Sequence, residues 1–173
     1  MLPSVSRWTG STGIATVLAI AAALSPVTAS AATATGSLTV NASVASVCLI
    51  SNGALNFGSY DPTSGSVLNG STTVTLTCTL GTAYNIGLDA GAGSGATVAL
   101  RKMTSSGNTL GYRLFRDAGR TLNWGNTALT DTLDGTSSAS SLTNTITIYG
   151  QIPASSAVPT GSYTDTVAIT VTY

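Results

Sequence analysis

The chain has 173 residues, which suits one ordinary domain, and its six basic and six acidic side chains leave no formal net charge at pH 7. A neutral chain offers no electrostatic case for binding nucleic acid or an anionic membrane. It contains no histidine, and all of its acidic residues are aspartates, so the usual histidine- and glutamate-based catalytic sets are excluded. Threonine, valine, serine and glycine are abundant, which is typical of strands joined by tight turns. We predict an all-β protein that is not an enzyme and needs no cofactor or metal.

Residues 1–31 have the pattern of a secretory signal peptide. Arg7 supplies a short basic start, an apolar run follows from Gly13, and Ala29-Ser30-Ala31 form an A-x-A type cleavage site. The run is too short and too rich in small residues to be a good membrane span, although an N-terminal anchor is the alternative. We predict cleavage after about Ala31, export of the chain, and no membrane span in the mature protein.

Residues 32–46 form a segment of their own before the first cysteine. It contains the strictly alternating stretch GSLTVNASV, which is typical of a half-buried strand. No Lys, Pro or bulge guards this strand against association with another chain. The apolar side of the alternation consists of Leu38, Val40, Ala42 and Val44.

The only two cysteines, Cys48 and Cys78, open the predicted domain, residues 47–173. In an exported protein a lone pair is most simply one disulfide. Closing a loop of this length stabilises a fold by about 3–4 kcal/mol on the chain-entropy model. Two free thiols would need a reducing compartment, and two cysteines without histidine make a poor metal site.

The middle of the chain shows short strand patterns separated by turn clusters, as in a sandwich or barrel. STTVTLTCTL, AYNIGLD and NTITIYGQI alternate clearly, ALNFGSY is shorter, and GAGSG is interpreted as a flexible turn. The scattered aspartates suit turn capping. Trp124 is either a packed core residue or part of a sugar-binding platform. The side chains predicted to point inward are Val74, Leu76, Cys78, Leu80, Tyr84, Ile86, Leu88, Ile146 and Ile148.

The sequence ends within an alternating strand, YTDTVAITVTY, whose apolar side consists of Val167, Ile169, Val171 and Tyr173. Two interpretations are open. In the first, the two terminal strands pair within one closed sandwich. In the second, the sandwich is incomplete, and the front strand of one molecule fills a gap in the next by β-strand addition.

Five blocks in order resemble the spore coat U domain family, which includes subunits of archaic chaperone–usher pili such as the Csu pilus. The blocks are VCLISNGALNFGSYDP, VTLTCTLGTAYNIGLDAG, LGYRLFRDAGRTLNWG, IYGQIP and PTGSYTDTVAITVTY, and the similarity spans about residues 36–173. The one departure noticed is Phe115, where the family usually has Tyr.

The resemblance implies an incomplete immunoglobulin-like β-sandwich completed by donor-strand exchange. It implies a surface pilus subunit that supports adhesion and biofilm formation, with a periplasmic chaperone, an outer-membrane usher and related pilin subunits as partners. Gly36–Val44 would be the donor strand, and Tyr163–Tyr173 would form one wall of the acceptor groove. A spore coat protein and a secreted adhesin are the alternatives.

Overall fold

The computed structural model describes residues 29–138 and 142–173, and these residues form eight strands and no helix. No helix in these ranges is therefore available to cross a membrane. The predicted all-β class is confirmed. The strands are β1 (Cys48–Ile50), β2 (Leu68–Cys78), β3 (Ala83–Leu88), β4 (Arg101–Ser105), β5 (Asn108–Phe115), β6 (Leu133–Thr136), β7 (Thr143–Ile152) and β8 (Ile169–Thr172).

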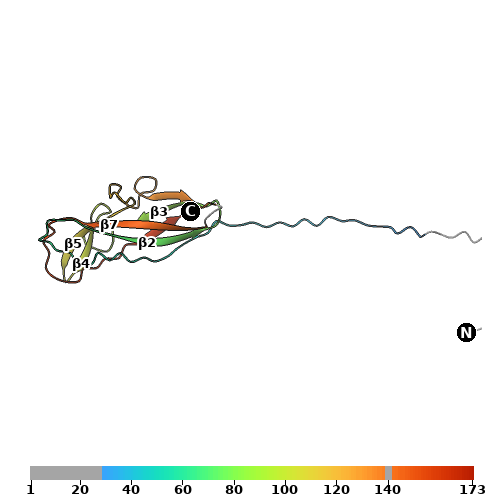
Figure 1. The fold of residues 1–173 in the computed structure, drawn as a ribbon. Helices are drawn as coiled ribbons and strands as arrows, with labels where there is room; N and C mark the ends of the chain where they lie inside the picture. Colours follow the sequence, from blue (N-terminus) through green and yellow to red (C-terminus); the bar gives the residue numbers. More distant parts are fainter. Residues whose placement is uncertain (1–28, 139–141) are drawn as a thin grey trace, which may run out of the picture. The chain divides into compact units, whose positions relative to one another are not determined.

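One sheet contains five antiparallel strands in the order β1-β2-β7-β5-β4. Its longest pairing joins β2 to β7 over ten residue pairs (Figure 1). Alternation decides which face is buried. Val74 and Leu76 of β2 lie in the core beside Ile146 and Ile148 of β7, whereas the intervening threonines of β2 are exposed.

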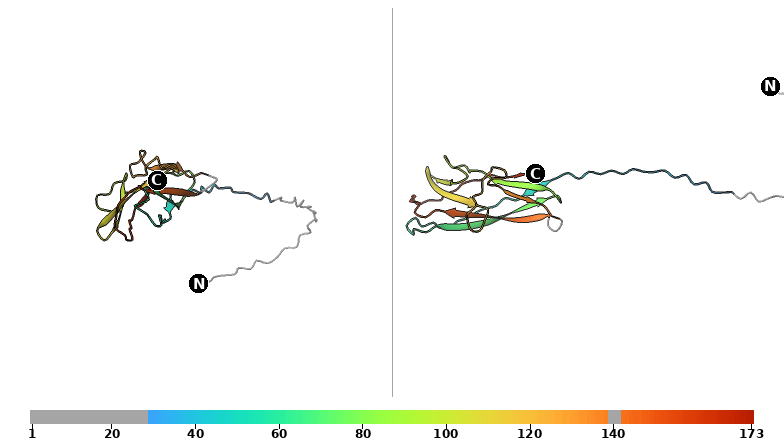
Figure 2. Two further views of the ribbon diagram at one scale, coloured as in Figure 1. Left: turned by 60° about the vertical axis from the view of Figure 1, so that its left-hand side comes forward. Right: turned by 90° about the horizontal axis from the view of Figure 1, so that it is seen from above.

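The second sheet has the order β6-β3-β8 and supplies the other half of the core. Ile86 and Leu88 of β3 are buried there. Trp124 is fully buried, and its indole N–H donates a hydrogen bond to the carbonyl of Ile86 at 2.9 Å. Trp124 is thus a core residue, and the interpretation of it as an exposed sugar platform is wrong. The two sheets form an immunoglobulin-like β-sandwich, seen from two further sides in Figure 2.

Three expectations about strands are corrected. Leu80 is 60% exposed, because β2 ends at Cys78 and the chain then turns. Tyr173 is 56% exposed, because the last residue pair of β8 joins Thr172 to Asn85. ALNFGSY, residues 54–60, forms no strand.

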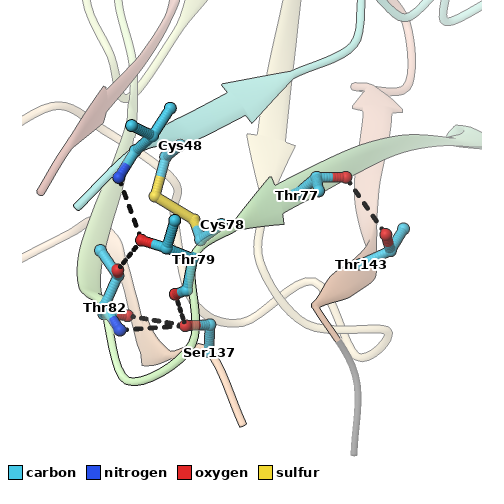
Figure 3. Close-up of a disulfide and its surroundings, with 8 residues drawn as sticks. Cys48, Thr77, Cys78, Thr79, Thr82, Ser137 and Thr143 are labelled. Atoms are coloured by element: carbon cyan, nitrogen blue, oxygen red, sulfur yellow. Dashed lines mark hydrogen bonds between the residues drawn. A yellow bond between two sulfur atoms is a disulfide. The ribbon is translucent and has the colours of Figure 1, made fainter. Parts of the chain in front are cut away.

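Cys48 and Cys78 form the predicted disulfide (Figure 3). They are directly opposite in the β1–β2 register, with their Cα atoms 4.1 Å apart, so the bond reinforces an existing strand pair. Thr79 adds hydrogen bonds next to the disulfide. Its hydroxyl accepts a hydrogen bond from the Val47 main-chain N–H at 3.1 Å and is hydrogen-bonded to the Thr82 hydroxyl at 2.7 Å. The start of the domain is therefore tied firmly to the β2–β3 turn.

Residues 29–47 precede β1 as an extended trace without strands (Figure 2). Leu38, Val40 and Val44 are 81–89% exposed, and Ala42 is exposed as well. The predicted signal peptide lies outside the described residues except for 29–31.

Candidate binding groove

Two adjoining cavities of about 350 and 620 Å³ open on the domain and share Leu55, Phe57, Met103 and Tyr163 in their linings. Together they form one groove, bounded by residues from 53–62 on one side and from 158–169 on the other. We call the first wall residues 53–60 and the second wall residues 163–169. Neither wall is part of a regular strand except at Ile169.

The floor of the groove is the hydrophobic core itself. Its lining includes side chains that are at most 6% exposed and come from both sheets. A cleft that reaches this deeply offers apolar side chains a fully desolvated site, where each is worth about 1.5–3 kcal/mol. The buried floor residues are Leu88, Leu110, Tyr112, Leu114, Ile148 and Ile152.

The first wall is held by side chains rather than by a main-chain ladder. Leu55 and Phe57 lie over the cross-strand glycine pair Gly70 and Gly150. A Cβ atom on Gly150 would meet Leu55 Cδ2 at 2.5 Å and Phe57 Cζ at 2.7 Å, so only glycine leaves room for them. The Phe57 ring also packs edge-on against Tyr112, with centroids 6.2 Å apart.

Main-chain groups of the first wall are almost all unpaired. Among the described residues, the only hydrogen bond made by the main chain of 52–60 is from Gly58 N–H to the Asn56 side chain, at 2.8 Å. At the end of the wall, the side-chain hydroxyl of Tyr60 donates to the Pro153 carbonyl at 2.9 Å. This stretch is therefore an open edge that another strand could pair with.

The second wall has one paired side and one open side. Thr164 exchanges two main-chain hydrogen bonds with Thr104, and the carbonyl of Ala168 accepts one from Asp89. Because a strand alternates its main-chain groups between its two sides, those of Asp165, Val167 and Ile169 point to the other side, which borders the groove. Within the described part of the chain, Val167 makes no main-chain hydrogen bond.

Behind the second wall lies a network that we call the carboxylate clamp: Asp89, Arg101, Tyr112 and Asp165. The Tyr112 hydroxyl donates to Asp165 Oδ2 at 2.7 Å. Burial, reinforced by this hydrogen bond and the Asp165 charge, raises the pKa of Tyr112 far above its usual value. Arg101 is fully buried, and its burial lowers the pKa of the guanidinium, although nearby Asp89 and Asp165 counteract that shift.

The remaining aspartates have structural roles, as turn capping predicted. The pKa of Asp61 lies below its usual value because of hydrogen bonds from Thr63, and that of Asp117 because of the Leu122 N–H first of all. The described residues contain no group of three Cys or Asp side chains placed to hold a metal ion. Main-chain N–H groups donate to five of the six aspartates: Asp61, Asp89, Asp117, Asp131 and Asp165.

The structure distributes the predicted site residues unevenly. Val167 and Ile169 line the groove, whereas Val171 packs against the core outside the lining, and Tyr173 is exposed. The predicted donor residues Leu38, Val40, Ala42 and Val44 are all exposed, and none of them is part of the groove lining. Sequence reasoning missed the first wall as a groove element, although the alternation of Leu55 and Phe57 in ALNFGSY was a signal for it.

Comparisons with known proteins agree with the resemblance found in the five sequence blocks. A family model described as Spore Coat Protein U domain matches residues 34–170. Protein U from Myxococcus xanthus is 38% identical over 180 residues, which cover 94% of this chain and 97% of that protein.

A solved structure shares the fold. It is one chain of the crystal structure of the CsuC–CsuE chaperone–tip adhesion subunit pre-assembly complex from archaic chaperone–usher Csu pili of Acinetobacter baumannii. The match covers 75% of this chain, with a TM-score of 0.54 and 21% sequence identity. It covers 40% of that longer chain. With the family match over most of its length, the chain belongs to the Spore Coat Protein U domain family, whose members are structural proteins rather than enzymes.

Proposed function

We propose that this protein is a structural subunit of a surface pilus, assembled by the chaperone–usher pathway through donor-strand exchange and supporting adhesion and biofilm formation. One observation carries the proposal. An apolar groove opens on the core between two unpaired chain edges, while an exposed segment with strand alternation precedes the domain. A strand supplied by another molecule would complete the sheet and cover the core.

The dimensions of the two parts agree. Leu38 to Val44 spans six residue steps, about 20 Å when extended, and the second wall from Tyr163 to Ile169 spans the same number of steps. Main-chain hydrogen bonds to the open side of the second wall would supply affinity. Leu38, Val40, Ala42 and Val44 would enter the groove in turn and set the register.

An empty groove of this kind explains the proposed partners. Unpaired edges beside exposed core residues favour aggregation, so a free subunit needs cover. A periplasmic chaperone would supply a temporary strand, and an outer-membrane usher would exchange it for the donor segment of another copy or a related subunit. The assembled subunit would then stand on the cell surface.

Deleting residues 36–44 tests the donor segment. The truncated subunit should keep its disulfide and bind a chaperone, yet form no polymer when it is purified and incubated alone. Polymers of the truncated chain, seen by electron microscopy, would show that the donor is a different segment.

A matched pair of substitutions tests the register. Val40→Asp places a charge in the groove, where burial costs several kcal/mol, about 100-fold or more in assembly. Thr39→Asp places the same charge one residue away, on the outward side, and should change assembly little. Equal effects of the two variants would refute the assigned alternation.

A spore coat role is the second candidate, favoured by the match of residues 34–170 to the family model described as Spore Coat Protein U domain. Immunogold labelling of whole cells and spores separates the candidates. Fibres projecting from cells support the pilus, and labelling confined to spore surfaces supports the coat. Neighbouring chaperone and usher genes would agree with the first result.

A further inference from the structure

The second wall includes a short stretch that no sheet holds. At one end of the stretch, Thr164 forms an isolated bridge to Thr104 of β4. At the other end, the pairing of β8 with β3 starts at Ile169. Between them, residues 165–168 pass from the edge of one sheet to the edge of the other. Two residues of this crossing stretch, Asp165 and Val167, line the groove.

Two aspartates hold the crossing stretch reciprocally. Asp89 Oδ1 accepts a hydrogen bond from the Ala168 N–H at 2.9 Å. Asp165 Oδ1, from the crossing stretch itself, accepts one from the Ala92 N–H at 2.8 Å. Gly91 sits between them with φ +79°, and a Cβ there would lie 2.2 Å from Asp165 Oδ2. The GAGSG loop is therefore hydrogen-bonded to the wall through Ala92, a contact that its composition did not predict.

The hairpin of β4 and β5 fixes both halves of this contact. Arg101 and Tyr112 are opposite each other in its register. Arg101 donates to the carbonyl of Leu88 at 2.9 Å and to that of Asp89 at 2.7 Å, which fixes the loop. Tyr112 donates to Asp165, which fixes the wall.

We propose that the carboxylate clamp positions the second wall for strand capture, with Asp165 as its main positioning residue. The clamp keeps residues 165–168 extended while the groove is empty, so the main-chain groups of Val167 stay directed at the incoming strand. A pre-ordered edge lowers the entropic cost of capture. The inference rests on the proposed function, because it assumes that a strand enters this groove.

The test measures capture of a fluorescent peptide with the sequence of residues 36–44 by the mature chain, kept dilute enough to stay monomeric. Asp165→Ala should slow association about tenfold or more, equivalent to about 1.4 kcal/mol. Asp165→Asn keeps an acceptor oxygen for the Ala92 N–H and should recover much of the rate. Asp117→Ala is the matched control. Asp117 also accepts hydrogen bonds from main-chain N–H groups, those of Thr121 and Leu122, but it does not line the groove. The association rate of the Asp117→Ala variant should therefore stay within about twofold of wild type.

The outcomes separate the two proposals. If the wild-type chain captures no peptide, the proposed function is wrong. If wild type captures peptide and Asp165→Ala does so equally fast, or if Asp117→Ala slows capture as much, the clamp inference is wrong. Tyr112→Phe serves if Asp165→Ala fails to fold: it keeps the ring and removes only the hydrogen bond to Asp165, and it should slow capture by a smaller factor. An unchanged rate in Tyr112→Phe would then overturn the inference.

Discussion

The two walls of the groove are held in different ways. The first wall lies over Gly70 and Gly150 through Leu55 and Phe57, with its main chain nearly unpaired. The second wall is fixed by main-chain bonds on one side and by the carboxylate clamp behind it. Side-chain packing allows small main-chain shifts, whereas a partly buried network of directional hydrogen bonds favours one arrangement.

This difference suits a groove that must accept a strand. One rigid edge can set the register, and one adaptable edge can close over the side chains that enter. Different contacts hold the two walls, so a substitution can weaken one wall and spare the other.

Arg101→Leu should have the largest effect, on the second wall. The change leaves the carbonyls of Leu88, Asp89 and Trp124 without their donor, and the bonds to Leu88 and Trp124 are buried. We expect a loss of about 4 kcal/mol or more in the free energy of unfolding, measured by urea titration. Lys102→Leu is the neighbouring control: its ammonium makes one exposed contact, to Ser94, and its loss should cost about 0.5 kcal/mol or less. Similar losses for the two variants would contradict the role of Arg101.

Removal of the disulfide should weaken the start of the first wall. β1 and the Ser51–Thr75 hydrogen bond are the last main-chain anchors before residue 53. Replacing Cys48 and Cys78 by Ser opens a loop with a sequence separation of 30 residues and should cost about 3–4 kcal/mol in the free energy of unfolding. Wild type under a reducing agent should show the same loss, and a loss below about 1 kcal/mol in both would disprove this anchoring.

Gly150→Ala should disturb the first wall directly. The added methyl group collides with Leu55 and Phe57, and overpacking of this kind costs about 1–3 kcal/mol. In a Leu55→Ala background the same change should cost clearly less, because the side chain it meets first is gone. Urea titrations of the four proteins of this cycle give the coupling, and a cost independent of Leu55 would show that the contact is unimportant.

Local patterns predicted those parts of the molecule that depend on alternation. The buried side chains of β2, β3 and β7 and the half-buried positions of Val167 and Ile169 follow from period-two sequences packed on one core. The disulfide followed from the count of cysteines and the inferred export.

Long-range polar contacts escaped prediction because they leave no local pattern. Arg101 appears in the sequence as one more charged residue, yet its side chain is fully buried and donates hydrogen bonds to the carbonyls of Leu88, Val98 and Trp124. The glycines of GAGSG suggest freedom, but Ala92 among them donates its N–H to Asp165, 73 residues later in the chain. The role of the first wall in the groove was also missed. Its sequence alternates like a strand, but whether such a segment finds a partner strand depends on the fold and not on the local pattern.

The smallest expected effect is a pH dependence that belongs to the second wall alone. In the unfolded chain Tyr112 loses its proton near pH 10, whereas burial and Asp165 keep it protonated in the fold well above that pH. The unfolded state therefore gains stability as pH rises above about 10, and the free energy of unfolding falls by up to about 1.4 kcal/mol per pH unit. Tyr112→Phe should lose about 1–2 kcal/mol at neutral pH, from the missing hydrogen bond, but lack this alkaline slope. The other tyrosines are common to both proteins, so the difference between their urea titrations from pH 8 to 11 reports on Tyr112. Parallel curves would mean that the fold does not keep Tyr112 protonated, whereas curves that converge with rising pH would show that it does, as its burial and its contact with Asp165 require.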